Sequence, residues 1–144
     1  MKLASGDRKL IQEAINVIIR SRPVRLKDTG DVGAALITPE GNVYSGVCLG
    51  FQCGIGTCGE YQAIGAMISG GEKVIRAIVA VWFDDKTGRY QVIPPCGKCR
   101  ETISQICREN RNTEVIISES EKVKLSELLP HPWEYIMEKG PDSE

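Results

Sequence analysis

The chain has 144 residues, of which 42% are hydrophobic and 26% charged, and its formal net charge is −1. These values are typical of a globular protein and disfavour disorder and an electrostatic surface for duplex nucleic acid. No apolar run of membrane-spanning length or signal-peptide core is present, so we expect a cytoplasmic protein that acts on a small molecule without membrane contact. One domain is expected over residues 1–144, with a core from about 7 to 133 and a C-terminal tail over 134–144.

Hydrophobic periodicity predicts a helix and then a hairpin in the first third of the chain. Residues 7–20 place leucine and isoleucine at helical spacing, and Ser5 or Asp7 is available as the N-terminal cap. Residues 32–50 are typical of two strands around a turn at residues 39–42, which predicts a β-hairpin.

The middle of the chain predicts a loop, a helix and two strands. Residues 50–57 are glycine-rich and lead into a helix that begins at about Cys58 and ends at Gly70 and Gly71. The continuous apolar run over 73–83 is typical of a central strand covered on both faces, and residues 84–95 turn and pair back with it.

The last third predicts a helix over 97–110, a strand over 113–118 and a short helix over 126–129. Trp82, on the central strand, is expected in the core. Together these elements indicate an α/β fold in which helices cover both faces of one mixed sheet of about five strands.

Cysteine is unusually frequent in this chain. Because a chain with an ordinary core and no export signal has little need of disulfides, metal or redox chemistry is the preferred interpretation. The six cysteines are Cys48, Cys53, Cys58, Cys96, Cys99 and Cys107.

Three of these thiols have the spacing of metal ligands. Cys96 and Cys99 are three residues apart at the start of one predicted helix, and Cys58 opens another. Zinc prefers such ligands, and a catalytic zinc site uses three protein ligands and leaves one position for water. We expect the helix N-termini to lower the pKa values of these thiols.

A carboxylate and two cations accompany the thiols. Glu60 is the candidate proton shuttle, provided that Cys58 lies at or just before the helix cap, since residues two apart do not face each other within a helix. A divalent metal with three thiolates carries a formal charge of minus one, which Lys98 and Arg100 would offset together with the helix dipoles.

The stretches "CGE" at 58–60 and "PCGKC" at 95–99 resemble the zinc deaminase signature in its all-cysteine form. Residues 32–46 look like the strand pair of small cytidine deaminases and blasticidin S deaminases, and residues 125–133 resemble their C-terminal ending. The resemblance implies a cytidine deaminase-like three-layer α/β/α sandwich and a hydrolase that replaces an exocyclic amine by oxygen and releases ammonia. It implies one zinc per subunit on the three thiols, with Glu60 moving protons.

The resemblance also implies substrate contacts. The Gly59 backbone N–H and the backbone carbonyl near Pro94 would hold the ring and its amine. Trp133 would lie near the base, often in the pocket of a neighbouring subunit, so a homotetramer or a dimer is expected.

Three positions depart from the nucleoside deaminase pattern. Cys48 and Gly50 are candidate substrate-binding positions, because they stand where those enzymes carry an asparagine and a glutamate that bind ribose hydroxyls. Tyr61 replaces a common arginine. We therefore expect the substrate to be a cytosine-like nucleoside, a free base or a related aminated heterocycle. A blasticidin S-type nucleoside-antibiotic deaminase is the alternative.

Other interpretations of the cysteines stay open. The thiols can be buried core residues or a redox pair, and Cys53 can join the other three in a closed structural site. The last case would make the protein a nonenzymatic zinc-stabilised binding domain.

Overall fold

A mixed six-stranded sheet forms the middle layer of the structure, a computed structural model that describes residues 1–24 and 26–133. The tail expected over 134–144 lies outside the described residues. The described helices are α1 (Ser5–Ser21), α2 (Gly59–Ser69), α3 (Gly97–Ile106) and α4 (Leu125–Leu128), with short 3₁₀ turns at Arg22–Val24 and Arg108–Asn112. The strands are β1 (Val32–Ile37), β2 (Val43–Val47), β3 (Ala77–Asp84), β4 (Arg89–Ile93), β5 (Glu114–Ile116) and β6 (Lys122–Lys124).

Strand β3 is central, as predicted. It pairs antiparallel with β1 along one edge, and β1 pairs antiparallel with β2. Along its other edge, the first residues of β3 pair in parallel with β5, and the rest pair antiparallel with β4. The sequence analysis missed β6, which pairs antiparallel with β5 and contains two lysines among its three residues, so it carries no hydrophobic alternation.

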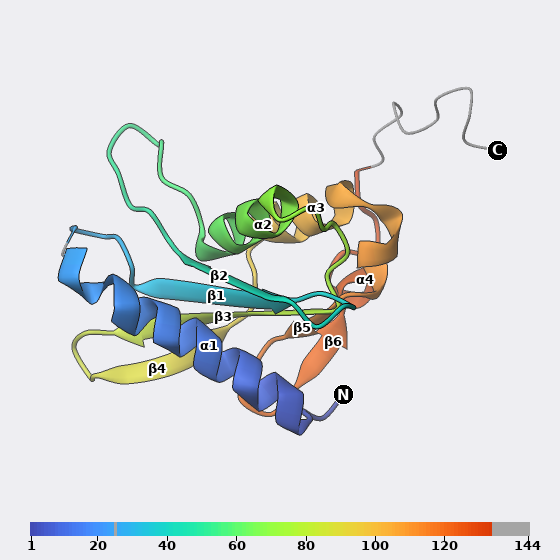
Figure 1. Cartoon of the computed structure of the whole chain (residues 1–144), viewed down its shortest axis with the longest axis horizontal. Helices are drawn as coiled ribbons and strands as arrows, with labels where there is room; N and C mark the ends of the chain where they lie inside the picture. Colours follow the sequence, from blue (N-terminus) through green and yellow to red (C-terminus); the bar gives the residue numbers. More distant parts are fainter. Residues whose placement is uncertain (25, 134–144) are drawn as a thin grey trace.

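Helices cover the sheet on both faces, with α1 on one face and α2 and α3 on the other (Figure 1). Alternation along β3 explains the two cores, because successive side chains point to opposite faces. Ile78 and Ala80 belong to the cluster under α2 and α3, whereas Ala77, Val79 and Val81 belong to the cluster under α1. The three-layer α/β/α arrangement is confirmed. None of the described helices has the length and apolarity needed to cross a membrane.

The start of α1 differs from the prediction. Its N-cap is Ala4, and neither Ser5 nor Asp7 is the cap. Asp7 lies in the first turn, where its Oδ2 accepts a hydrogen bond of 2.7 Å from the Ala4 N–H. The same oxygen lies 2.8 Å from Lys122 Nζ, so an ion pair with β6 holds the buried Asp7 carboxylate at the first turn of α1.

Trp82 was wrongly predicted to be a core residue. It follows Ile78 and Ala80 on the face that α2 and α3 cover, but 39% of it is exposed. The apolar run therefore continues beyond the part of the strand that the helices bury. The end of α3 also differs from the prediction. The helix ends at Ile106, four residues before the predicted end, because Cys107 adopts an extended backbone.

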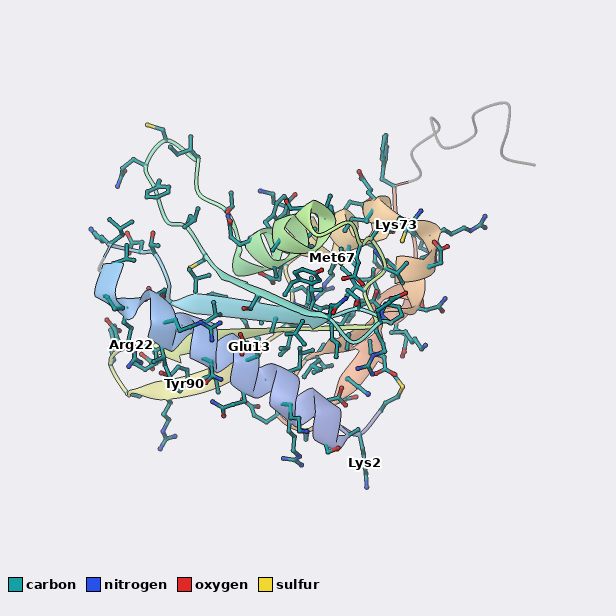
Figure 2. The ribbon with its side chains drawn as sticks, in the orientation of Figure 1. Lys2, Glu13, Arg22, Met67, Lys73 and Tyr90 are labelled. Carbon is teal, nitrogen blue, oxygen red and sulfur yellow. The ribbon has the colours of Figure 1, made fainter. Side chains whose placement is uncertain are left out.

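The end of β3 and the start of β4 contact Arg22, which directly follows α1 (Figure 2). Arg22 donates a 2.6 Å hydrogen bond to the Tyr90 hydroxyl, and its guanidinium lies 4.7 Å from the centroid of the Phe83 ring. Phe83 and Tyr90 are cross-strand neighbours with ring centroids 4.9 Å apart. This contact fixes the β3–β4 hairpin, whose second strand leads directly to α3.

Helix α2 lies very close to the β1–β2 hairpin. A side chain at Gly46 would place its Cβ 2.3 Å from the Gln62 Cβ and 3.0 Å from the Ala63 nitrogen. Only glycine allows this approach, which sets the depth at which the start of α2 rests on the sheet.

We expect Gly46→Ala to lower the free energy of unfolding by about 1–3 kcal/mol, because overpacking forces the helix away from the strand. Gly65→Ala is the matched control, since a Cβ at Gly65 meets nothing within 4 Å and alanine is the better helix former. Urea denaturation of both variants checks this. Equal stability of the two proteins would contradict the assigned contact.

Candidate active site

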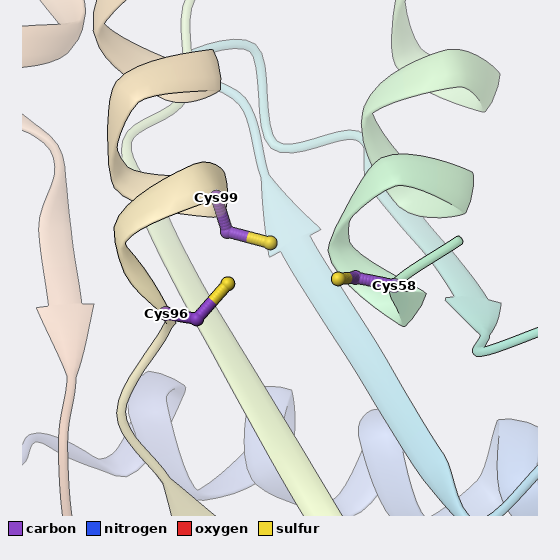
Figure 3. A group of neighbouring side chains, drawn as sticks. All are labelled: Cys58, Cys96 and Cys99. Carbon is purple, nitrogen blue, oxygen red and sulfur yellow. The ribbon is translucent and has the colours of Figure 1, made fainter. Parts of the chain in front are cut away.

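Two of the predicted ligands occupy equivalent positions at the starts of two helices. Cys58 is the N-cap of α2 and Cys96 is the N-cap of α3, both with extended backbone angles. Both thiols point into the space between the two helix starts (Figure 3). Cys58 thus meets the condition under which it can share a pocket with Glu60.

The third thiol completes a cluster between the helices. Cys99 lies in the first turn of α3, is 1% exposed, and points toward Cys58 and Cys96 (Figure 3). The three Sγ atoms all lie within 4.8 Å of one another. Tetrahedral zinc with Zn–S bonds of about 2.3 Å would hold its sulfurs roughly 3.8 Å apart, so these thiols fit zinc with only small side-chain adjustments.

The cluster contains three ligands and not four. Among the described residues, the metal-binding group is limited to Cys58, Cys96 and Cys99. Cys53 is exposed and lies in the loop between β2 and α2, with a positive φ of 62°. Three protein ligands with one open position are typical of a catalytic zinc site, whereas a structural site has four.

Glu60 lies beside the thiols and is almost fully buried, with 5% exposed. Burial raises the pKa of its carboxyl above the usual value, although its own backbone N–H and the Cys99 thiol act in the opposite direction. A carboxyl in such a place can take up and release a proton, as a general acid–base group must.

The thiols do not all have the lowered pKa values that the helix N-termini predict. The backbone N–H of Cys99 donates to Cys96 and lowers the pKa of the Cys96 thiol, as expected. Burial instead raises the pKa values of Cys58 and Cys99, and the Glu60 charge adds to this effect. The prediction is therefore wrong for two thiols, because desolvation outweighs the helix dipole at those positions.

Lys98 and Arg100, the predicted charge-compensating residues, flank Cys99 on α3. Lys98 Nζ lies 4.6 Å from the centroid of the Tyr61 ring on α2. The Tyr61 hydroxyl accepts a 2.7 Å hydrogen bond from Thr102. Arg100 donates to the backbone carbonyls of Pro95 and Leu128, at 2.8 and 3.2 Å.

A cavity of about 370 Å³ opens beside the thiols and Glu60. Three of the five predicted substrate residues line it: Cys48, Gly59 and Pro94. Gly50 and Trp133 are not among its lining residues, and Trp133 is 58% exposed, with its backbone N–H donating to Glu101.

Much of the cavity wall was missed by sequence analysis. Apolar residues at strand ends and in loops carry no signal that distinguishes a pocket wall from a core. Gln62 donates a 2.5 Å hydrogen bond to Thr57, one of these missed residues. The missed lining residues are Val32, Leu49, Gly56, Thr57 and Ile93.

A second cavity of equal volume lies between the β1–β2 turn and the end of α2. Its wall contains Tyr44, Glu72 and Lys73 but no cysteine. The Tyr44 hydroxyl donates a 2.7 Å hydrogen bond to Glu72 and lowers the pKa of that carboxyl. The chemistry of the side chains therefore assigns the active site to the cavity beside the thiols.

Comparison with known proteins identifies the family. No protein-family model matches the sequence. The blasticidin-S deaminase of Bacillus cereus is 34% identical over 103 residues, which cover 69% of this chain and 74% of that enzyme. This chain belongs to the cytidine deaminase-like family.

Solved structures show the fold of this cytidine deaminase-like protein independently. The cytidine deaminase of Mycobacterium leprae superimposes with a TM-score of 0.71 at 22% identity, covering 90% of this chain and 100% of that one. The cytidine deaminase of Mycobacterium tuberculosis superimposes with a TM-score of 0.71 at 23% identity, covering 89% of this chain and 97% of that one. The predicted family, fold and enzyme class are confirmed, and the protein is a hydrolytic deaminase.

We expect Cys99→Ser in this deaminase to lower bound zinc to less than about a tenth of the wild-type amount, because it removes the buried ligand that joins two helices at one metal. Metal analysis of the purified protein measures this. Cys107→Ser is the matched control, since Cys107 is also buried but lies just beyond the other end of α3. Cys53→Ser should keep its zinc, and loss of zinc in that variant would support the four-thiolate site.

Proposed function

We propose that the protein is a zinc-dependent deaminase of a cytosine-like nucleoside, free base or related aminated heterocycle. The observation that carries this proposal is the convergence of three thiols next to a cavity that Cys58, Cys96 and the buried Glu60 line. The similarity to blasticidin-S deaminase supports the reaction class.

One zinc ion per chain would be held by Cys58, Cys96 and Cys99. When bound, zinc supplies the Lewis acidity that activates a water molecule. The three ligands are carried by two helices that rest on the same face of the sheet, so the site is rigid. Its open side adjoins the cavity, where the substrate amine would enter.

Glu60 would move the protons of the reaction. Its carboxylate would take one proton from the attacking water and pass it to the ring nitrogen as the C–O bond forms. It would then take the second proton from the new hydroxyl and pass it to the amine, so that the C–N bond breaks, a carbonyl forms and ammonia leaves. The Gly59 N–H belongs to the first turn of α2, where backbone donors lack helical partners, and can bind an acceptor atom of the ring. The Pro94 carbonyl would accept from the amine.

The charge of the ligand set needs compensation close to α3. Lys98 supplies it in our proposal, because the Tyr61 ring holds its ammonium at the interface between α2 and α3. Arg100 contributes its charge and also fixes the chain before the ligands through the Pro95 carbonyl.

The proposed assembly is a homo-oligomer, a tetramer or a dimer, in the cytoplasm. Large apolar side chains on exposed loops support association, with 47% of Phe51 and 69% of Ile55 exposed. All six cysteines are free, as is usual for cytoplasmic proteins.

Glu60→Gln tests the function directly. We expect kcat for release of ammonia from cytosine-type substrates to fall at least about 100-fold, because the amide cannot carry the proton, while zinc content is unchanged. Glu72→Gln is the matched control, since Glu72 lines the other cavity and should leave kcat unaltered. Full activity of Glu60→Gln would refute the assigned role.

Lys98→Met tests charge compensation. We expect kcat to fall about tenfold with zinc retained, since a nearby unit charge is worth more than the 1.4 kcal/mol that this change requires. Lys98→Arg should restore most of the rate because it restores the charge. If Lys98→Met and wild type have the same kcat, the charge must be offset elsewhere.

A second candidate substrate is a nucleoside antibiotic of the blasticidin S type. Sequence identity to blasticidin-S deaminase favours it, as does the basic residue within the Cys-Gly-Lys-Cys step at 96–99. Ammonia release from blasticidin S alone, among a panel that includes cytosine, cytidine and deoxycytidine, would select this candidate.

A further inference from the structure

Most of the wall of the active-site cavity is apolar. Val32, Leu49, Ile93 and Pro94 line it, together with glycines that contribute no polar side-chain atom. Among the described lining residues, none is lysine, arginine, aspartate, asparagine or histidine. Such a wall offers contact area to a flat ring but few groups that recognise hydroxyls.

Apart from Cys58, Cys96 and Glu60, two polar side chains line the cavity, and both have partners within the protein. The Thr57 hydroxyl accepts a hydrogen bond from Gln62 at 2.5 Å. The Cys48 sulfur accepts one from the Val32 N–H at 3.4 Å. Sulfur is a weak acceptor, whereas the Thr57 hydroxyl keeps its O–H donor and one lone pair after it accepts from Gln62. One such hydroxyl does not make the pair of strong hydrogen-bonding side chains that a sugar diol needs.

The structure also explains why no side chain extends from residue 50. A Cβ at Gly50 would lie 1.9 Å from the carbonyl oxygen of Asp28. The segment that contains Asp28 is fixed in place, because the Gly50 N–H donates to Thr29 at 2.9 Å and the Gly30 N–H donates to the Cys48 carbonyl at 3.0 Å. Backbone therefore fills the space that a polar side chain from residue 50 would need.

We infer that this site binds its substrate through the aminated ring alone and does not recognise sugar hydroxyls. The inference rests on the proposed deaminase function and narrows its substrate class. The substrates are free aminated pyrimidines, or pyrimidines whose ring nitrogen carries a substituent that the site accommodates without specific hydrogen bonds. Selectivity then arises at the amine and the ring edge, next to Glu60 and the backbone at Gly59.

The test compares substrates that differ only in hydroxyl groups. For the zinc-loaded wild-type enzyme, we measure kcat/KM for 1-methylcytosine, 2′,3′-dideoxycytidine, 2′-deoxycytidine and cytidine. We expect values within about tenfold of one another, because a site with buried partners for a hydroxyl rejects analogues that lack it by roughly 10⁴-fold. Cytidine exceeding dideoxycytidine by more than about 100-fold would overturn the inference and leave the deaminase function intact.

Binding separates the two proposals when turnover is low. In Glu60→Gln, which should bind without reacting, the Kd values of cytidine and dideoxycytidine are expected to agree within about tenfold. Deamination of none of the four compounds, together with no binding, would overturn both the function and the inference. Measurable binding that strongly favours cytidine would overturn the inference alone.

Thr57→Val tests the one hydroxyl in the wall. The ratio of kcat/KM for cytidine to that for dideoxycytidine should stay within about threefold of the wild-type ratio, since Gln62 already orients the Thr57 hydroxyl and one hydroxyl cannot replace the paired partners of a sugar diol. A decrease of more than about tenfold in that ratio would show that Thr57 hydrogen-bonds the sugar hydroxyls and would overturn the inference.

Discussion

The active site depends on two helices that begin side by side on one face of the sheet. Cys58 and Cys96 are N-cap residues with extended backbones, and their thiols point into the space between the two helix starts. Gly46 lets α2 rest directly on the hairpin, and β4 delivers the chain to the start of α3. The ligand geometry is therefore a property of the sheet and its packing, and no local motif creates it alone.

Charge is the second constraint on this site. Three thiols and a buried carboxyl occupy one small volume, where desolvation disfavours the ionised forms of Cys58, Cys99 and Glu60. A divalent cation at the thiols reverses this balance, because its charge favours deprotonated ligands. The Lys98 ammonium, held by the Tyr61 ring, adds positive charge at the same helix interface without occupying the cavity.

The clustering of the three thiols beside Glu60 was predictable from the sequence, whereas the cavity was not. Cys58, Glu60 and the Cys96–Cys99 pair carry side-chain chemistry and spacing that few other functions require. The walls at Val32 and Ile93 look like ordinary strand residues, and they become pocket residues only through tertiary packing. Desolvation of Cys99 also escaped prediction, because burial of a helix start depends on what packs above it.

The elements that hold the metal ligands differ from those that shape much of the substrate wall. The ligands belong to the starts of α2 and α3, while Cys48, Leu49 and Thr57 lie where the loop over 48–57 leaves and rejoins the core. Backbone hydrogen bonds of 2.9 Å between Leu49 and Thr57 close that loop. Substitutions in the loop can therefore change which ring substituents fit while the thiols and Glu60 keep their positions. The groups proposed for the reaction and the apolar residues proposed to contact the ring substituent therefore belong largely to different segments of the chain.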